Sequence, residues 1–261
     1  MKESGNSSIV FDIETMPLDV QTVRARTAPF EAPAHPGEFD PKSVKTGNVK
    51  DPVKIAAKID DARKAHLSLV DNYARNVAAQ ERDYYAAAYD RAPLSPMTGR
   101  VLAIGIGFAN GNNHYLALNE ANDVNESGLL EEFWRDFYYP SIKASFNLIG
   151  HNIHDFDVPF LIRRSWLLGI DIPENILRGR YLNDAFIDTM ARWNCGSRSS
   201  GYVKLDTLGQ ALGVGGKLEG VNGADFHRLY FGSANDRIKA MDYLEADVNV
   251  TRNVARRMGL I

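Results

Sequence analysis

The amino-acid sequence predicts an α/β fold built around a mixed β-sheet. Short runs of β-branched and aromatic residues come first, and further along the chain such runs alternate with segments of helical periodicity. In addition, the turn Asn110-Gly111-Asn112-Asn113 joins two apolar runs, a pattern typical of a β-hairpin. The hairpin requires antiparallel strands, whereas strand–helix alternation favours parallel ones, so we expect both kinds of pairing in one sheet.

These patterns predict five strands, with a long insertion after the first. Residues 8–13 form a β-branched and aromatic run typical of a buried strand. Residues 17–52 are rich in Pro, Gly, Lys and Asp, which predicts a long loop. Residues 53–90 carry apolar side chains at helical spacing, which predicts one long helix or two shorter ones. The other predicted strands are residues 100–109, 114–118, 146–150 and 185–188, and the other predicted helices are residues 128–141, 159–168, 189–193, 205–212 and 234–257.

The composition suits a single globular domain in which residues 17–98 form an insertion of loop and helix. The net charge of −3 is not that of a strongly basic nucleic-acid coat, but a carboxylate-rich site would lower the charge of a nucleic-acid enzyme in the same way. Cys195 is the only cysteine, which predicts a reducing, cytoplasmic location without disulfides. No apolar run approaches the roughly 20 residues that span a bilayer, and the polar segment at residues 1–8 lacks a signal-peptide core, so we expect no membrane association.

Two acidic residues lie at the end of the first predicted strand. Asp12 and Glu14 are two positions apart, so their side chains point to the same face of the strand. Carboxylates gathered in this way are costly unless they are paired, solvated or bound to cations. The pair alone therefore leaves two alternatives open, a metal site or solvated side chains on an edge strand.

A second acidic residue of interest, Asp157, follows the predicted strand at residues 146–150 and precedes a helix. By itself it suits a helix N-cap, with Pro159 in the first turn. The same position would also face the C-terminal edge of the sheet, where α/β proteins bind their ligands. Both interpretations fit the sequence.

The last predicted helix carries Tyr243 and Asp247, which are four residues apart and share one face. The apolar stripe of this helix runs from Ile238 through Leu244 to Met258. Since both residues precede stripe positions by one residue, we expect them at the border of the core. A solvated Asp beside a half-buried Tyr is the alternative to a functional pair.

Taken together, these motifs resemble those of the DEDD superfamily of 3′→5′ exonucleases, which have the ribonuclease H-like fold. The matching residues are Phe11-Asp12-Ile13-Glu14-Thr15, then Asn152, Phe156 and Asp157 in an Asn-x3-Phe-Asp pattern, and finally Tyr243 and Asp247 in a Tyr-x3-Asp pattern. The tyrosine subtype is indicated, because position 242 is Asp where the histidine subtype has His. The chain looks most similar to stand-alone relatives of the exonuclease domain of family B DNA polymerases, from residue 8 to about residue 257, with residues 17–98 outside the catalytic pattern.

This resemblance implies a two-metal-ion site with Mg²⁺ or Mn²⁺. Asp12 would bridge the two ions, Glu14 and Asp247 would hold the ion that activates water, and Asp157 would hold the second ion partly through waters. Tyr243 would orient the attacking water, because a Tyr with an ordinary pKa near 10 is a poor base at neutral pH. Candidates to hold the terminal nucleotides are Thr15, Asn152 and Phe156, although Phe156 suits a core anchor equally well.

The substrate implied is the 3′ end of single-stranded DNA, released as nucleoside 5′-monophosphates during repair or proofreading, with a polymerase as a protein partner. An RNA exonuclease is the alternative, because discrimination of the 2′-OH depends on pocket shape. A catalytically silent nucleic-acid-binding module is a second alternative, against which the complete carboxylate set argues. We expect the helical insertion to flank the substrate channel.

For several other polar residues the sequence favours or allows a structural role. We expect Asp188 to cap the helix that follows it, although it could also line the site. We expect no metal pair at His151 and His154, since hard carboxylates already fill that role, and a structural role for Cys195. Five arginines suit either phosphate contacts or solvated helix faces: Arg163, Arg164, Arg252, Arg256 and Arg257.

Overall fold

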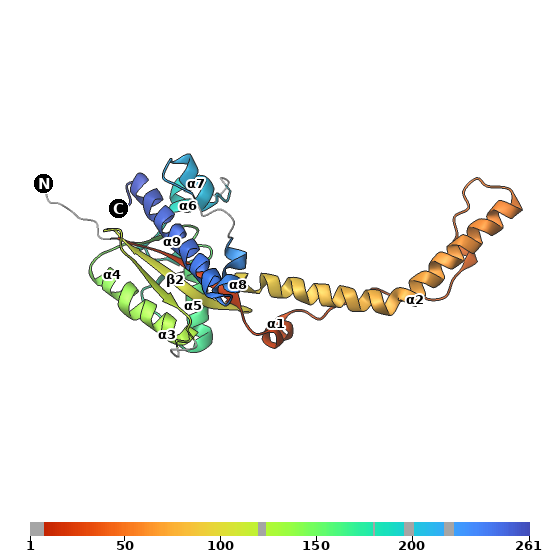
Figure 1. The fold of residues 1–261 in the computed structure, drawn as a ribbon, viewed down its shortest axis with the longest axis horizontal. Helices are drawn as coiled ribbons and strands as arrows, with labels where there is room; N and C mark the ends of the chain where they lie inside the picture. Colours follow the sequence, from red (N-terminus) through yellow and green to blue (C-terminus); the bar gives the residue numbers. More distant parts are fainter. Residues whose placement is uncertain (1–7, 120–123, 180, 196–200, 217–221) are drawn as a thin grey trace. The chain divides into compact units, whose positions relative to one another are not determined.

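The computed structural model describes residues 8–119, 124–179, 181–195, 201–216 and 222–261. The polar segment before residue 8 lies outside this range. The chain divides into two compact units, each considered by itself. The sheet unit comprises Met1–Leu18 and Ala92–Ile261, and the helical unit comprises Asp19–Arg91 (Figure 1).

The sheet unit is built on one five-stranded sheet with the order β3-β2-β1-β4-β7. β1 pairs antiparallel with β2, as β2 does with β3, while β1–β4 and β4–β7 are parallel. The predicted mixed five-stranded sheet is therefore confirmed. The strands are β1 (Ile9–Pro17), β2 (Gly99–Phe108), β3 (Asn113–Ala117), β4 (Leu148–Gly150) and β7 (Phe186–Asp188).

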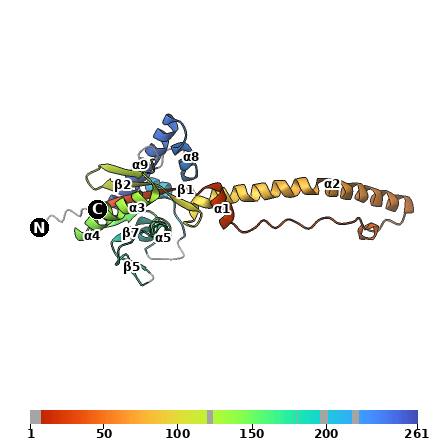
Figure 2. The same ribbon diagram turned by 90° about the horizontal axis from the view of Figure 1, so that it is seen from below.

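Helices cover both faces of this sheet. The long helix α9 (Ala234–Arg257) packs against β1, β2 and β4 on one face, and α3 (Glu126–Glu132) and α5 (Asp157–Leu168) lie on the other (Figures 1 and 2). The helix predicted at 128–141 is interrupted, because a π-helical turn at Phe133–Tyr138 follows α3. The remaining elements are η2 (Ala92–Leu94), η4 (Phe133–Tyr138), α4 (Tyr139–Lys143), β5 (Leu177–Arg178), β6 (Tyr181–Leu182), α6 (Thr189–Trp193), α7 (Leu205–Ala211), η5 (Gly223–Asp225) and α8 (Phe226–Tyr230). Of these, the β5–β6 hairpin, α8 and the short 3-10 turns η2 and η5 were not predicted.

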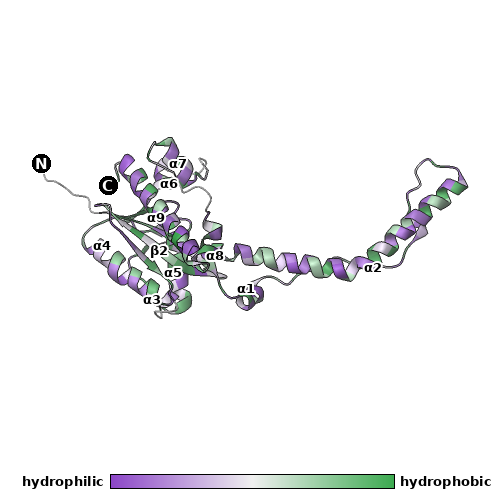
Figure 3. Ribbon diagram, in the orientation of Figure 1, coloured by the Kyte–Doolittle hydropathy of each residue, from purple (hydrophilic) through white to green (hydrophobic). Residues whose placement is uncertain are grey.

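The side chains of β1 alternate between the two faces. Phe11 is fully buried, with its ring centroid 5.6 Å from that of Phe133, on the side of α3 and α5. Val10 instead belongs to a cluster with Val248 of α9. Because strand residues alternate with a period of two, Asp12 and Glu14 share the face of Val10 and so face α9. The hydrophobic colouring of the central strands in Figure 3 fits a sheet that is buried on both sides.

The close approach of α9 to the sheet depends on glycine in β2. A Cβ atom at Gly105 would lie 2.7 Å from Cγ2 of Val248 and 2.9 Å from Cδ1 of Leu244. A Cβ at Gly107 would lie 2.6 Å from Cγ1 of Val248. These contacts are too short for a methyl group, so the two glycines set the depth at which α9 lies on the sheet.

We expect Gly105→Val to lower the free energy of unfolding by about 1–3 kcal/mol, because overpacking pushes α9 off the sheet. Urea unfolding followed by circular dichroism measures this change. The matched control is Gly128→Ala in α3, where an added Cβ has only Asn125 Oδ1 within 4 Å, at 3.8 Å. Equal stability of Gly105→Val and the unmodified protein would show that α9 does not rest on β2 as described.

Two of the arginines considered for phosphate binding are buried within the sheet unit. The guanidinium of Arg164 forms an ion pair with Glu126 at 2.6 Å, and both side chains are almost fully buried. Glu126 also accepts a hydrogen bond from the backbone N–H of Val101, so the pair fastens α5 and α3 to β2. Arg252 is buried and donates to Asn249 at 2.8 Å. For Arg164 and Arg252 the phosphate interpretation is wrong, because their guanidinium groups serve the fold.

The helical unit consists of α1 (Val20–Arg26), η1 (Pro41–Ser43) and α2 (Pro52–Arg91). α2 is one helix of 40 residues, which corresponds to a length of about 60 Å. The prediction of a loop over residues 17–52 missed α1, whose N-cap Asp19 accepts a hydrogen bond from Thr22 N. α1 has only 7 residues, which is too few to show a clear helical periodicity in the sequence.

An extended segment from residue 28 to residue 50 runs alongside α2. The hydroxyl of Tyr84 donates to Ala28 O at 3.1 Å, that of Tyr73 donates to Pro33 O at 2.7 Å, and Lys58 Nζ donates to Thr46 O at 3.2 Å. No residue of α2 is fully buried. The helical unit is thus a two-layer element without a core of its own, and its predicted place beside a substrate channel stays a prediction.

Among the described residues, no helix combines the length with the apolar character that crossing a bilayer requires.

Candidate active site

A cavity of about 410 Å³ opens where β1, the β4–α5 loop and α9 meet. Of the predicted site residues, those that line it are Asp12, Glu14, Asn152, Phe156, Asp157, Tyr243 and Asp247. Thr15 is absent from its lining. Seven side chains from three motifs far apart in the sequence therefore meet at one place.

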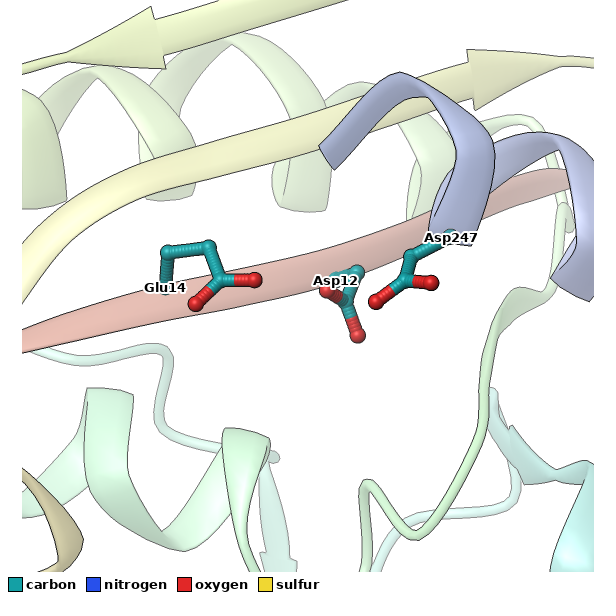
Figure 4. A group of neighbouring side chains, drawn as sticks. All are labelled: Asp12, Glu14 and Asp247. Carbon is teal, nitrogen blue, oxygen red and sulfur yellow. The ribbon is translucent and has the colours of Figure 1, made fainter. Parts of the chain in front are cut away.

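Three carboxylates form the centre of this cavity. Asp12 and Glu14 of β1 and Asp247 of α9 each offer an oxygen, and these oxygens all lie within 4.8 Å of one another. Figure 4 shows the three side chains directed toward the same space, with Asp247 approaching from α9 above the strand. Glu14 is only 7% exposed and Asp247 only 3%, while Asp12 is half-buried. The strand period and the close packing of α9 produce this arrangement together.

The electrostatics of such a group favour a cation. Carboxylates held close together in a buried place repel one another and lose solvation, and both effects disfavour the charged forms. A divalent cation offsets both costs. Since all three donors are hard oxygens, they suit Mg²⁺ or Mn²⁺ better than a soft metal. The donor set therefore fits the predicted class of metal.

Tyr243 lies one helical turn before Asp247 and is also buried, deeper than the border position that was predicted. Its hydroxyl oxygen and Oε2 of Glu14 lie 3.6 Å and 3.8 Å from the point where a Cβ of Gly223 would stand. The hydroxyl thus faces the same corner of the cavity as Glu14. The predicted apolar stripe is wrong at Ile238, which is 57% exposed, because the buried positions of α9 begin at Ala240.

Asp157 does not cap α5, because the N-cap residue is Phe156. Its Oδ1 instead accepts a hydrogen bond from the backbone N–H of Ile13 at 3.1 Å, which ties α5 to β1 between the two strand carboxylates. Burial raises the pKa of Asp157 to about 7, the negative charge of Asp188 adds to the rise, and the Ile13 N–H opposes it. Asp157 lines the cavity but is not one of the three carboxylates within 4.8 Å.

The three predicted substrate contacts differ in their surroundings. Phe156 is half-buried and lines the cavity, and its ring also packs against Phe160 at 5.5 Å, so both interpretations of this residue fit. Asn152 lines the cavity from a backbone with φ of 62°. Thr15 follows a β-bulge in β1, and its hydroxyl donates to Pro93 O at 2.9 Å. A contact between Thr15 and substrate stays a prediction.

The loop between β4 and α5 is held in place by Asp188. Its carboxylate caps α6 by accepting from Met190 N at 2.8 Å, as predicted. It also accepts from the backbone N–H groups of Asn152 at 2.9 Å and His154 at 3.0 Å. The two histidines of the loop have separate partners, since His151 contacts Thr189 and His154 contacts Phe186 O. The absence of a metal pair at these two rings stays a prediction.

Several cavity residues were not predicted from the sequence. Two of them are Ile13 of β1 and His151 of the β4–α5 loop. The others come from the segments around α7 and η5 and are Tyr202, Lys204, Leu205, Asp206, Asn222 and Gly223. Lys204 adds an exposed cation to a lining that is otherwise rich in carboxylates. No local pattern marks the positions around α7 and η5, because only the tertiary fold brings these loops and short helices to β1. Cys195, expected to be structural, is exposed instead.

A family model described as RNase_H superfamily matches residues 91–258 of this chain. The chain therefore belongs to the RNase H superfamily. Membership indicates a nuclease-type hydrolase with a nucleic-acid substrate, and nucleases of this fold usually use divalent metal ions. The buried acidic group of Asp12, Glu14 and Asp247 agrees with that requirement.

Among solved structures, the chain is similar to the family B DNA polymerase from the hyperthermophilic archaeon Pyrobaculum calidifontis, with 17% sequence identity and a TM-score of 0.49. The match covers 64% of this chain and 22% of that polymerase. No curated protein sequence matches the chain.

Proposed function

We propose that this protein is a metal-dependent 3′→5′ exonuclease of the tyrosine subtype, which removes nucleoside 5′-monophosphates from the 3′ end of single-stranded DNA. The observation that supports this most is the convergence of Asp12, Glu14 and Asp247 within 4.8 Å, with Tyr243 beside Glu14. A cytoplasmic location stays the prediction made from the sequence. A replicative or repair polymerase stays the predicted protein partner.

Phosphodiester hydrolysis needs a nucleophile and stabilisation of the charge on the leaving 3′-oxygen. A pair of Mg²⁺ or Mn²⁺ ions, when bound, supplies both. In this proposal the carboxylates of Asp12, Glu14, Asp157 and Asp247 would hold the ions. The hydrogen bond from Ile13 N fixes one oxygen of Asp157 and so orients the carboxylate.

The other cavity residues position the substrate and the attacking water. Tyr243 donates a hydrogen bond from its hydroxyl to the attacking water on the side of Glu14. Phe156 offers a ring face to a terminal base, and Asn152 offers an amide to the sugar or base edge. Lys204 attracts the phosphate that enters a site lined mainly by carboxylates.

The proposal is tested with a 5′-labelled single-stranded DNA and the purified full-length chain. In Mg²⁺ or Mn²⁺ we expect a ladder of products shortened one nucleotide at a time, with nucleoside 5′-monophosphate released and no reaction in excess chelator. A circular single strand of the same composition is the matched control and should stay intact, since it has no 3′ end.

The alternatives give different results in the same assay. Digestion of RNA but not of DNA would show that the substrate is RNA. Cleavage of the circle would contradict the requirement for an end. Binding of strands without digestion in either metal ion would contradict the enzyme proposal and indicate a silent binding module.

A further inference from the structure

A second cavity, of about 510 Å³, lies beside the candidate active site in the sheet unit. Its walls come from the outer face of α5, the β5–β6 hairpin and two residues of the β4–α5 loop. None of the predicted catalytic or substrate-binding residues lines it. Its function is therefore not explained by the site already described.

Large aromatic side chains line this cavity and remain open to solvent. Trp166 and Tyr181 are each 56% exposed, and Leu177 of the hairpin is 36% exposed. On α5, Trp166 follows Arg163 by three residues and Ile162 by four, so the three share one face of the helix. Exposed aromatic rings beside a cation form a surface on which nucleobases stack, with little regard to sequence.

The polar groups of the cavity favour bases over an isolated anion. Arg163 and His154 contribute positive or hydrogen-bonding groups, but the carboxylate of Asp155 is present too. A carboxylate repels a phosphate placed inside the cavity, whereas it accepts hydrogen bonds from the exocyclic amines of bases. Bases can therefore occupy the cavity while the phosphates stay toward solvent.

The two cavities share a single wall. Asp155 lines the aromatic cavity, and the next residue, Phe156, lines the candidate active site. The two cavities therefore lie on the two sides of one loop, and a strand that extends beyond the 3′-terminal nucleotides can reach the second cavity. Asp188 holds this wall through the backbone N–H groups of Asn152 and His154, which keeps the distance between the cavities fixed.

We propose that the cavity between α5 and the β5–β6 hairpin binds the bases of single-stranded nucleic acid that precede the 3′-terminal nucleotides. This inference rests on the proposed exonuclease function and extends it. Trp166 and Tyr181 stack on the bases, and Arg163 meets the backbone at the rim. The site sets how well longer strands bind, and the chemistry at the carboxylates does not depend on it.

The test compares a labelled trinucleotide and a labelled dodecamer of oligodeoxycytidylate, whose bases carry exocyclic amines. Both are bound to the 261-residue chain in excess chelator and followed by fluorescence anisotropy. We expect Trp166→Ala combined with Tyr181→Ala to weaken dodecamer binding about tenfold or more. Binding of the trinucleotide should not change. Trp166→Phe should retain most of the affinity, because it keeps a ring face.

The matched control is Trp193→Ala in α6, a Trp that is 46% exposed and lines neither cavity. It should bind both oligomers as the unmodified protein does. In Mg²⁺ the double variant should show a raised KM for the dodecamer, with kcat and trinucleotide digestion unchanged.

The outcomes separate this inference from the proposed function. If the unmodified protein digests strands but the double variant binds and digests the dodecamer equally well, this inference is wrong and the exonuclease proposal stands. That result would leave the aromatic cavity to a protein partner. If the unmodified protein neither binds nor digests strands, both proposals fail.

Discussion

Asp247→Asn is expected to lower the rate of strand digestion by at least about 1000-fold, equivalent to about 4 kcal/mol of barrier. The carboxylate is nearly fully buried and contributes one of the three oxygens within 4.8 Å. Asparagine has almost the same shape, so the packing of α9 is retained while one negative charge is lost. In the proposed mechanism this charge helps to hold a divalent cation, and such a cation commonly supplies several kcal/mol of transition-state stabilisation.

The measurement is single-turnover digestion of a 5′-labelled strand over a range of Mn²⁺ concentrations. The control variant is Asp242→Asn, one residue before Tyr243 on the same helix, whose side chain is exposed. It carries the same change of charge and should digest strands at the normal rate. Near-normal activity of Asp247→Asn at low Mn²⁺ would remove Asp247 from the site.

A second readout separates loss of chemistry from loss of structure. Without metal, Asp247→Asn should be at least as stable as the unmodified protein, because it relieves repulsion from Asp12 and Glu14. Added Mn²⁺ should stabilise the unmodified protein, since a ligand that binds only the folded state raises the free energy of unfolding. It should stabilise the variant much less. A destabilised variant would mean that its inactivity reports misfolding.

The arrangement of the candidate site could be predicted from sequence where a local period determines geometry. Two residues along a strand place Asp12 and Glu14 on one face, and four residues along a helix place Tyr243 above Asp247. The depth of that pair in the fold could not be predicted this way. It depends on Gly105, which sits far away in the sequence and allows α9 to approach β2 closely.

The features that the sequence did not predict also have particular physical causes. A β-bulge between Glu14 and Thr15 shifts the register of β1, and a bulge leaves no mark in the apolar pattern. Arg163 and Arg164 are adjacent but differ by about 100° around the helix, which exposes one and buries the other against Glu126. Lys204 enters the cavity from a segment without regular structure. Contacts of this kind follow from tertiary packing and not from local periodicity.

The contribution of Asp157 to the stability of the metal-free protein is expected to become less favourable as the pH rises from about 4 to about 7. Burial raises the pKa of this carboxyl from 3.8 to about 7, with Asp188 adding to the rise. Between these values the folded state keeps a proton that the unfolded state has released, so folding becomes less favourable as the pH increases. Above about pH 7 both states are ionised and the effect levels off.

The size of this effect is on the order of 4 kcal/mol, because each tenfold change in proton affinity is worth about 1.4 kcal/mol. Asp157→Asn should remove it, since the amide oxygen can still accept from Ile13 N and has no proton to lose. The variant should therefore match the unmodified protein near pH 4 and exceed its stability above pH 7. Urea unfolding in excess chelator at several pH values measures the difference between the two proteins, which cancels the contributions of other carboxylates.

Divalent metal should reverse this dependence. A cation near Asp157 favours the ionised carboxylate, so with Mn²⁺ the unmodified protein should gain stability above pH 7 and the variant should gain less. Asp155→Asn, an exposed change two residues earlier, should leave the pH profile unaltered. Parallel profiles for Asp157→Asn and the unmodified protein in chelator would show that Asp157 is already ionised when folded. In that case its burial against β1 would not hold the proton, and the carboxylate would be ready for a cation at every pH above its ordinary range.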